Sequence, residues 1–326
     1  MIDTHSDFGK GGGNAALFRF LKAIASAHWH RRKDRASFLY LAYGLEIAMS
    51  PRHSLADRLR QPGLVVAPGC HDAIGARAIE QAGFEAVYMT GNGLSASLIG
   101  APDIGLLTMT EMVARGRALA AAITVPLIAD ADTGYGNLNN VARTVAEYEA
   151  AGVAAIHLED QVTPKRCGAM KGLALVTREE QAEKIRIAVA TRRDPDFLII
   201  GRSDARLPLG LDEAIARGKA YAEAGADLVL LEMLQSEDEM KRALREIEAP
   251  LMFNYVEGRV PPLTADEFGR LGFKVLSYPV SSTLAYAHMM AAFARELKRS
   301  GTTRGLEPAM LDLPSYEAFL GREHYA

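Results

Sequence analysis

The feature that most constrains the fold is a regular alternation of short apolar runs with longer amphipathic segments. Most of the apolar runs are uninterrupted, which is typical of strands buried on both faces of a parallel sheet. There are eight of them: Leu64–Ala67, Ala86–Thr90, Pro126–Asp132, Ala154–Asp160, Phe197–Ala205, Leu228–Met233, Pro250–Tyr255 and Lys274–Pro279. A chain with this order of elements is expected to form a parallel sheet covered by helices.

The segments between these runs carry apolar residues three and four positions apart, the spacing of one helical face. The clearest are Ala73–Gln81, Thr110–Ala122, Asn139–Ala150, Arg178–Thr191, Leu211–Glu223 and Ser281–Arg299. Four helices are expected to stop at a glycine, which supplies a left-handed turn: Gly83, Gly152, Gly225 and Gly272. N-caps are predicted at Thr108 or Thr110 with Glu111, and capping boxes at Thr177 with Glu180 and at Thr264 with Glu267.

Eight strand–helix units predict a (β/α)8 TIM barrel, an α/β fold. The alternative, an open doubly wound sheet, is disfavoured because no Gly-x-Gly-x-x-Gly string follows the first strand and no Walker phosphate loop occurs. The 326 residues would suggest about two domains. We predict instead one catalytic barrel over residues 55–300, preceded by a basic extension over 1–54 and followed by a tail over 301–326.

The charge is unevenly distributed. Residues 1–50 carry seven Lys or Arg and four acids, a balance of +3, so the formal net charge of −3 leaves −6 for residues 51–326. The basic leader is interpreted as a helical extension, a start codon placed upstream of Met49, or a transit peptide. Neither nucleic acid nor a membrane is expected as a partner, because the chain is not basic overall and no apolar run reaches about 18 residues. Two cysteines favour free thiols in a reducing compartment, and we expect a cytoplasmic protein.

Acidic residues follow several of the predicted strands at their C-terminal ends, where TIM barrels carry their active sites. Asp130 and Asp132 end the third run, with both side chains expected on one face; Glu159 ends the fourth and Glu232 the sixth. Buried acids need a counter-charge, so this set predicts a cation. Oxygen ligands favour Mg²⁺, with Mn²⁺ as a substitute. The alternative is that each acid merely caps the helix that follows.

Two other side chains are expected at this end of the barrel. Arg202 can bind a substrate carboxylate through two nitrogens, or form an ion pair with a neighbouring acid. Cys167 lies in the long loop from Gln161 to Val176, which could act as a mobile lid. The neighbouring Lys165 and Arg166 are expected to lower the pKa of its thiol if they face it. Cys70 is interpreted as a small buried apolar residue.

These residues lie within strings that resemble the isocitrate lyase/phosphoenolpyruvate mutase superfamily from about Leu55 to Arg299. The matching strings begin at Tyr88 (Tyr-Met-Thr-Gly), Asp130 (Asp-Ala-Asp-Thr-Gly-Tyr-Gly), His157 (His-Leu-Glu-Asp-Gln), Lys165 (Lys-Arg-Cys-Gly), Gly201 (Gly-Arg-Ser-Asp-Ala) and Tyr278 (Tyr-Pro-Val-Ser). The resemblance implies the barrel, a Mg²⁺ ion and a small di- or tricarboxylate substrate. It also implies a homotetramer, or a homodimer, that exchanges C-terminal helices between subunits.

The resemblance further implies a role for each matching residue. Asp130, Asp132 and Glu159 would hold Mg²⁺, some of them through water. The substrate would be bound by Thr90, Gly91, Asn92, Gly168, Arg202, Glu232 and Asn254. Tyr88 would accept the proton of a substrate hydroxyl, and Cys167 would protonate the enolate that cleavage releases.

The sequence departs from the family's lyases at two positions. Ala169 stands where their loop continues Cys-Gly-His, and Leu284 stands where methylisocitrate lyases carry an arginine for the third carboxylate. The resemblance therefore implies a Mg²⁺-dependent carbon–carbon lyase of carboxylic acid metabolism that cleaves a 2-hydroxy dicarboxylate more readily than a tricarboxylate. The alternatives are an oxaloacetate decarboxylase, an enzyme processing phosphonopyruvate or carboxyphosphonoenolpyruvate, and a non-catalytic binding barrel.

Overall fold

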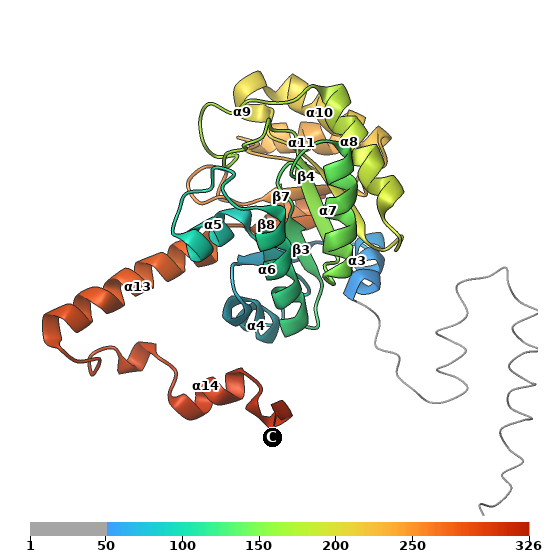
Figure 1. Cartoon of the computed structure of the whole chain (residues 1–326). Helices are drawn as coiled ribbons and strands as arrows, with labels where there is room; N and C mark the ends of the chain where they lie inside the picture. Colours follow the sequence, from blue (N-terminus) through green and yellow to red (C-terminus); the bar gives the residue numbers. More distant parts are fainter. Residues whose placement is uncertain (1–50, 326) are drawn as a thin grey trace, which may run out of the picture. The chain divides into compact units, whose positions relative to one another are not determined.

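The strands form a closed barrel of eight parallel strands in chain order, as predicted (Figure 1). The computed structural model describes residues 51–325, so the predictions for the leader over residues 1–50 lie outside the described residues. The strands are β1 Val65–Cys70, β2 Val87–Met89, β3 Leu127–Asp130, β4 Ala155–Glu159, β5 Leu198–Ser203, β6 Leu228–Leu231, β7 Leu251–Asn254 and β8 Val275–Tyr278. β1 pairs with both β2 and β8, which closes the sheet.

Each predicted run contains a strand, but most strands end earlier than the apolar run. β3 stops at Asp130 and β6 at Leu231, so the polar residues that follow belong to loops. β1 runs three residues beyond the predicted end at Ala67, through Pro68 and Gly69 to Cys70. Pro68 continues the strand because its register partner in β8 is Tyr278.

The helices surround the barrel and match the predicted amphipathic segments closely. Their bounds are α3 Pro51–Arg60, α4 Ala73–Gln81, α5 Gly91–Ile99, α6 Met109–Ala122, α7 Leu138–Ala150, α8 Arg178–Thr191, α9 Arg206–Leu209, α10 Leu211–Glu223, α11 Glu237–Glu246, α12 Ala265–Leu271, α13 Ser281–Ser300 and α14 Leu313–Phe319. All four predicted stop glycines have positive φ. Thr108 and Thr264 form complete capping boxes, whereas Thr177 caps α8 by accepting from the Glu180 N–H.

The core has two parts, one inside the barrel and one between the sheet and the helices. The inner cluster contains Tyr88, Ile128, Ile200 and their neighbours, together with Leu55 of α3. Leu55 lies next to the N-terminal ends of the strands, so α3 closes the barrel at the end opposite the loops that follow the strands. The mouth at the other end is therefore the face available for a site.

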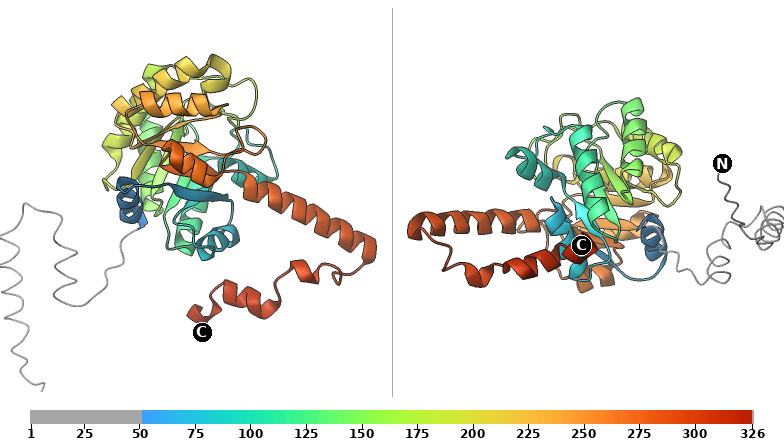
Figure 2. Two further views of the ribbon diagram at one scale, coloured as in Figure 1. Left: turned by 180° about the vertical axis from the view of Figure 1, so that it is seen from behind. Right: turned by 60° about the horizontal axis from the view of Figure 1, so that its bottom comes forward.

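Helix α13 extends away from the barrel and leads to α14 (Figures 1 and 2). Its first turn is fixed to the barrel, because the Ser282 hydroxyl donates to the Gly69 carbonyl at 2.6 Å. None of its twenty residues is buried. No helix within residues 51–325 is long and apolar enough to cross a membrane.

Candidate active site

The structure brings every predicted site residue to the mouth of the barrel. Tyr88, Asp130, Glu159, Arg202 and Asn254 lie in the last residues of β2, β3, β4, β5 and β7. The others lie in the segments that follow the strands: Thr90, Gly91, Asn92, Asp132, Cys167, Gly168 and Glu232.

Arg202 is the central cation of the mouth. Its Nε donates to Asp204 Oδ1 at 2.9 Å, and its Nη1 lies 3.1 Å from Glu159 Oε2. Glu232 Oε2 is farther away, 3.9 Å from Nε. The ion-pair interpretation of Arg202 is therefore confirmed, and these carboxylates hold the guanidinium in the orientation in which it faces the mouth.

Glu232 and Asn254 form a second hydrogen-bonded group. Asn254 Nδ2 donates to Glu232 Oε2 at 2.8 Å, and the Ser277 hydroxyl donates to Asn254 Oδ1. Burial raises the pKa of Glu232 to about 7, although Arg202 opposes this shift. Because this pKa is close to neutral pH, Glu232 can be charged or uncharged there, depending on the charges that lie next to it.

Asp130 and Asp132 meet at the mouth, but not in the way predicted. Strand alternation does not apply, because β3 ends at Asp130 and Asp132 has a φ of 47° in the turn beyond it. The turn is held by the Asp132 N–H, which donates to Asp130 Oδ1 at 2.9 Å, and by the Glu159 N–H, which donates to the Asp132 carbonyl. A left-handed turn, rather than a shared strand face, places these carboxylates together.

The mouth contains more buried acid than buried base. Six carboxylates in it are buried, those of Asp103, Asp130, Asp132, Glu159, Asp204 and Glu232, whereas the buried cations there are Lys165 and Arg202. If all of them were ionised, six negative charges would face two positive ones. Burial acts to raise the pKa of each of the three predicted metal ligands, to about 6 for Asp132, although neighbouring cations hold the pKa of Asp130 below its usual value. A further cation would relieve this imbalance.

Two of the predicted metal ligands have oxygens that accept no hydrogen bond: both oxygens of Glu159, and Asp132 Oδ1. Glu159 Oε2 and Asp132 Oδ1 are instead in ion-pair contact with Arg202 and Lys165. Across residues 51–325, no three His, Cys, Asp or Glu side chains converge closely enough to bind one ion directly. The donor set therefore fits an ion such as Mg²⁺, which keeps several waters and takes few protein oxygens directly.

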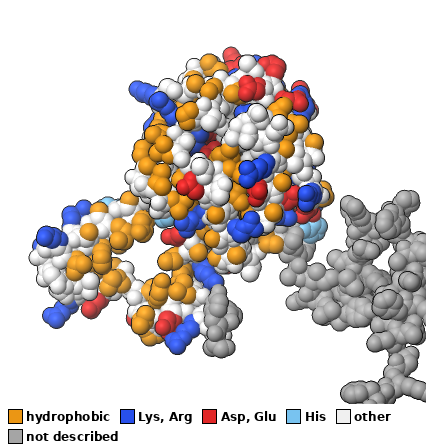
Figure 3. Space-filling model, in the orientation of Figure 1, with side chains coloured by type: hydrophobic (Ala, Val, Ile, Leu, Met, Phe, Trp, Pro, Cys, Tyr) orange, Lys and Arg blue, Asp and Glu red, His pale blue; other side chains and the backbone are white. Residues whose placement is uncertain are grey.

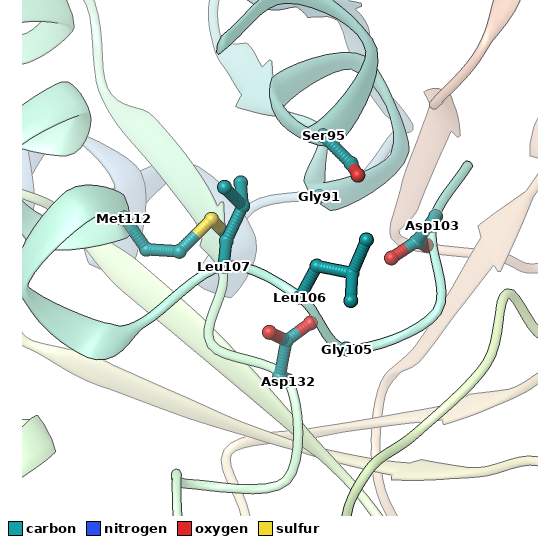
Figure 4. Close-up of a pocket in the computed structure, with 8 residues that line it drawn as sticks. All are labelled: Gly91, Ser95, Asp103, Gly105, Leu106, Leu107, Met112 and Asp132. Carbon is teal, nitrogen blue, oxygen red and sulfur yellow. The ribbon is translucent and has the colours of Figure 1, made fainter. Parts of the chain in front are cut away.

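Asp103, which the sequence did not single out, pairs at the mouth with Lys165, which was expected to act on Cys167. Lys165 Nζ lies 2.8 Å from Asp103 Oδ1 and 2.8 Å from Asp132 Oδ1. Figure 4 shows the carboxylates of Asp103 and Asp132 pointing into a small pocket from two sides, with Leu106 beside them. Because Asp103 comes from the loop before α6 and Lys165 from the loop after β4, no local pattern marks this contact.

The Cys167 loop lies closed over the mouth. The Cys167 N–H donates to the Asp103 carbonyl at 2.9 Å, and a Cβ on Gly168 would lie 2.6 Å from Arg202 Nη2. Only glycine fits there. Burial raises the pKa of the Cys167 thiol to about 11, so the prediction of a thiol with a lowered pKa was wrong. Burial is the main cause of this shift, and Lys165, which points at carboxylates, does not oppose it. The Cys167 thiol is therefore protonated at neutral pH.

Tyr88 forms a buried pair with a residue that was given no role from the sequence. The Tyr88 hydroxyl lies 2.6 Å from His157 Nε2, and His157 Nδ1 lies 3.7 Å from Asp130 Oδ1. Burial raises the pKa of Tyr88 and lowers that of His157 to about 4. A protonated Tyr88 can therefore donate to Nε2 of a neutral His157, whose single ring proton is then on Nδ1.

The predicted carboxylate-binding residues begin α5. Thr90 is its N-cap and accepts from the Gly93 N–H at 3.2 Å, while the Gly91 N–H donates to Asp130 Oδ2 at 3.3 Å. A Cβ at Gly91 would lie 2.5 Å from the same oxygen. Asn92 is half-buried in the first turn. The start of α5 thus packs directly against the Asp130 carboxylate, and Gly91 allows this because there is no room for a side chain at its position.

The other cysteine is buried, as predicted. Cys70 is 1% exposed, and burial raises the pKa of its thiol to about 12.

The chain is similar to proteins of known family along most of its length. The phosphoenolpyruvate phosphomutase family profile matches residues 55–298. A 2,3-dimethylmalate lyase of Eubacterium barkeri is 49% identical, over 84% of this chain and 96% of that protein. A 2-methylisocitrate lyase of Aeropyrum pernix is 38% identical, over 83% of this chain and 87% of that protein.

A solved structure of oxaloacetate acetylhydrolase in complex with 3,3-difluorooxalacetate aligns with a TM-score of 0.81 at 34% identity. The alignment covers 85% of this chain and 95% of that one.

Proposed function

Because the chain belongs to the phosphoenolpyruvate mutase/isocitrate lyase superfamily, we propose that it is a Mg²⁺-dependent carbon–carbon lyase acting on a 2-hydroxy dicarboxylate. The observation that carries the proposal is a protonated Cys167 thiol, closed over Arg202 in a mouth that is rich in acid. A thiol in that state can give a proton to a carbanion. The products would be a 2-oxo acid and a second carboxylic acid.

The metal would be held by Asp130, Asp132 and Glu159, in part through water. The buried oxygens of Glu159 and Asp132 that accept no hydrogen bond support this assignment. When bound, Mg²⁺ would act as a Lewis acid and would orient the substrate through its hydroxyl and one carboxylate. Mn²⁺ would fit the same oxygen ligands.

The reaction begins with the substrate hydroxyl. Tyr88 accepts its proton and passes its own to His157 Nε2, which lies 2.6 Å away, and His157 releases a proton to solvent before the next turnover. The electron pair left on oxygen forms the carbonyl of the 2-oxo acid as the bond between C2 and C3 breaks. The electron pair of that bond becomes the enolate of the second acid.

Cys167 then completes the reaction by protonating the enolate carbon, and its thiolate takes a proton back from solvent. Arg202, together with the backbone N–H groups at the start of α5, binds the developing negative charge. Gly168, Glu232 and Asn254 shape the remaining wall of the pocket. Gly168 allows the loop to approach Arg202 closely.

By the resemblance, Leu284 limits which carboxylic acid is accepted, because it stands where methylisocitrate lyases carry an arginine. An apolar side chain cannot bind the third carboxylate of a tricarboxylate, so the substrate is a dicarboxylate such as 2,3-dimethylmalate. The proposal is tested by incubating the chain and Mg²⁺ with a panel of 2-hydroxy and 2-oxo di- and tricarboxylates and measuring release of a 2-oxo acid. Cleavage of a 2-hydroxy dicarboxylate is expected. Release of CO₂ from oxaloacetate, or of phosphate from phosphonopyruvate, without any such cleavage would contradict the proposal.

The protein would work as a homotetramer, or as a homodimer, that exchanges its C-terminal helices. Large apolar side chains are exposed along α13 and α14, where Figure 3 shows them spread over the extension: Leu284, Tyr286, Met289, Met290, Leu297, Leu313 and Tyr316. A second copy of the chain would cover them. The cytoplasm is the proposed location, because the acid at Cys167 must remain a free thiol, as it is in the structure.

A further inference from the structure

Gln161 is a buried amide at the base of the Cys167 loop, 1% exposed and two residues beyond the end of β4. We infer that it is a positioning residue whose side chain holds the Cys167 loop closed and ties it to Arg202 through Asp204. It is not placed against the substrate. Its effect on catalysis rests on the proposed function, whereas its effect on the loop does not.

Two backbone contacts close the base of the loop. Gln161 and Leu175 form an antiparallel bridge, and the Val162 N–H donates to the Ala174 carbonyl at 2.8 Å. Farther along, the Cys167 N–H donates to the Asp103 carbonyl at 2.9 Å. The segment between the base and Cys167 is held by side-chain contacts.

The Gln161 side chain supplies such contacts beside the thiol. Its Oε1 accepts from the Arg166 N–H at 2.9 Å, and its Nε2 donates to the Arg166 carbonyl at 2.7 Å. The amide thus pairs with Arg166 as a neighbouring strand would, donating and accepting at one residue. Arg166 directly precedes Cys167. Holding the N–H and carbonyl of Arg166 in place therefore also holds the start of the Cys167 backbone in place.

The same Nε2 also reaches the carboxylate that orients Arg202. It donates to Asp204 Oδ2 at 2.5 Å, while Arg202 Nε donates to Asp204 Oδ1 at 2.9 Å. Asp204 is itself held in place, because its N–H donates to Asp160 Oδ1 at 2.8 Å. The buried Asp204 carboxylate therefore connects Arg202 to Gln161 at the base of the Cys167 loop.

These bonds require an amide and not a carboxylate. Both N–H groups of Gln161 face acceptors and its oxygen faces a donor. A glutamate in the same place would direct an oxygen at Asp204 and at the Arg166 carbonyl, and the loop would be repelled from its closed position. Gln161→Glu is therefore the sharpest variant, since it keeps the shape and size of the side chain.

Gln181 offers a matched control on the other side of β4. It is also fully buried, and its Nε2 donates to the Leu158 carbonyl at 2.9 Å. None of its hydrogen bonds in the described structure involves the Cys167 loop. Gln181→Glu disturbs a buried amide in the same strand region but leaves the Gln161 contacts in place.

The experiment measures the alkylation rates of the two cysteines in the full chain with iodoacetamide, using peptide mass spectrometry. In Gln161→Glu and Gln161→Ala we expect Cys167 to react about tenfold faster or more, because the loop opens and the thiol loses its burial. Cys70 is 1% exposed and reports global unfolding, so its rate is expected to stay unchanged. Gln181→Glu is expected to lower the melting temperature without changing the ratio of the two rates.

An unchanged ratio of Cys167 to Cys70 reactivity in both Gln161 variants would overturn the inference, and so would an equal rise in both rates. Steady-state kinetics add a second readout: Gln161→Glu should lower kcat more than it changes KM, since the acid is displaced while Arg202 remains. If no cleavage substrate is found, the proposed function fails, and the alkylation ratio still decides the role of Gln161.

Discussion

The mouth of the barrel and helix α13 are each incomplete in a single chain, and in opposite ways. The mouth buries six carboxylates beside two cations, whereas α13 exposes apolar side chains and buries none. Buried charge calls for a counter-ion, and exposed apolar surface calls for another surface. We propose that a small ligand completes the first region and a second copy of the chain the second.

The largest expected effect comes from removing the cation of the mouth. Excess chelator should lower cleavage of the 2-hydroxy dicarboxylate by at least roughly a thousandfold, because a Lewis acid contributes several kcal/mol to the transition state. Added Mg²⁺ should restore the rate. Undiminished turnover in chelator would show that the acids of the mouth need no metal.

Replacing the acid of the loop should have the next largest effect. Cys167→Ser should slow cleavage by roughly several hundredfold, within the range expected for a general acid. Cys70→Ala is the matched control, since it removes the buried thiol outside the mouth and should leave kcat unchanged. Full activity of the Cys167→Ser variant would exclude the acid role.

The pH dependence of cleavage also tests whether Cys167 acts as the acid. In the proposed mechanism the working form of Cys167 is the protonated thiol, and burial raises its pKa to about 11. Its contribution should therefore be constant through neutral pH and be lost only as the pH rises toward 11. A fall in kcat near pH 8 that is absent from Cys167→Ser would mean that the thiol titrates as an exposed cysteine does.

A substitution on α13 tests the proposal that a second copy of the chain covers its exposed apolar side chains. Met289 is 53% exposed in the single chain. Met289→Glu should weaken association by roughly 100-fold, because an unpaired carboxylate in an apolar interface costs several kcal/mol. Light scattering during size-exclusion chromatography measures this. A wild-type chain that elutes with the mass of one copy would contradict the proposed assembly.

The smallest expected effect concerns substrate choice at Leu284. Leu284→Arg should improve kcat/KM for a tricarboxylate such as methylisocitrate by about 10- to 100-fold relative to a dicarboxylate, since one charge-assisted hydrogen bond contributes about 1.5–3 kcal/mol. The ratio of the two kcat/KM values is the measurement. Efficient cleavage of methylisocitrate by the unaltered chain would show that Leu284 does not exclude it.

The order of strands and helices could be predicted from the sequence because hydrophobic periodicity is local. The bounds of α4, α8 and α10 agree with the predicted segments residue for residue. The acids at the ends of β3 and β4 were also found, since they follow buried strands directly.

Contacts between distant loops could not be predicted in this way. Lys165 and Asp103 are 62 residues apart, and their ion pair turns the lysine away from Cys167. The thiol's pKa was expected to fall if the basic residues faced it, but burial of the thiol raises it instead. His157 and Gln161 were overlooked because one histidine or one glutamine has no distinctive spacing until its partners are known.

Isotope labelling of the products tests the central claim most directly. The chain is incubated with Mg²⁺ and 2,3-dimethylmalate in D₂O, and the products are analysed by mass spectrometry and NMR. Carbon–carbon cleavage with protonation by Cys167 predicts a 2-oxo acid and a second acid that carries one deuterium next to its carboxylate, at a rate that falls in Cys167→Ser. Absence of both products, with decarboxylation or phosphate release from the other substrates instead, would contradict it.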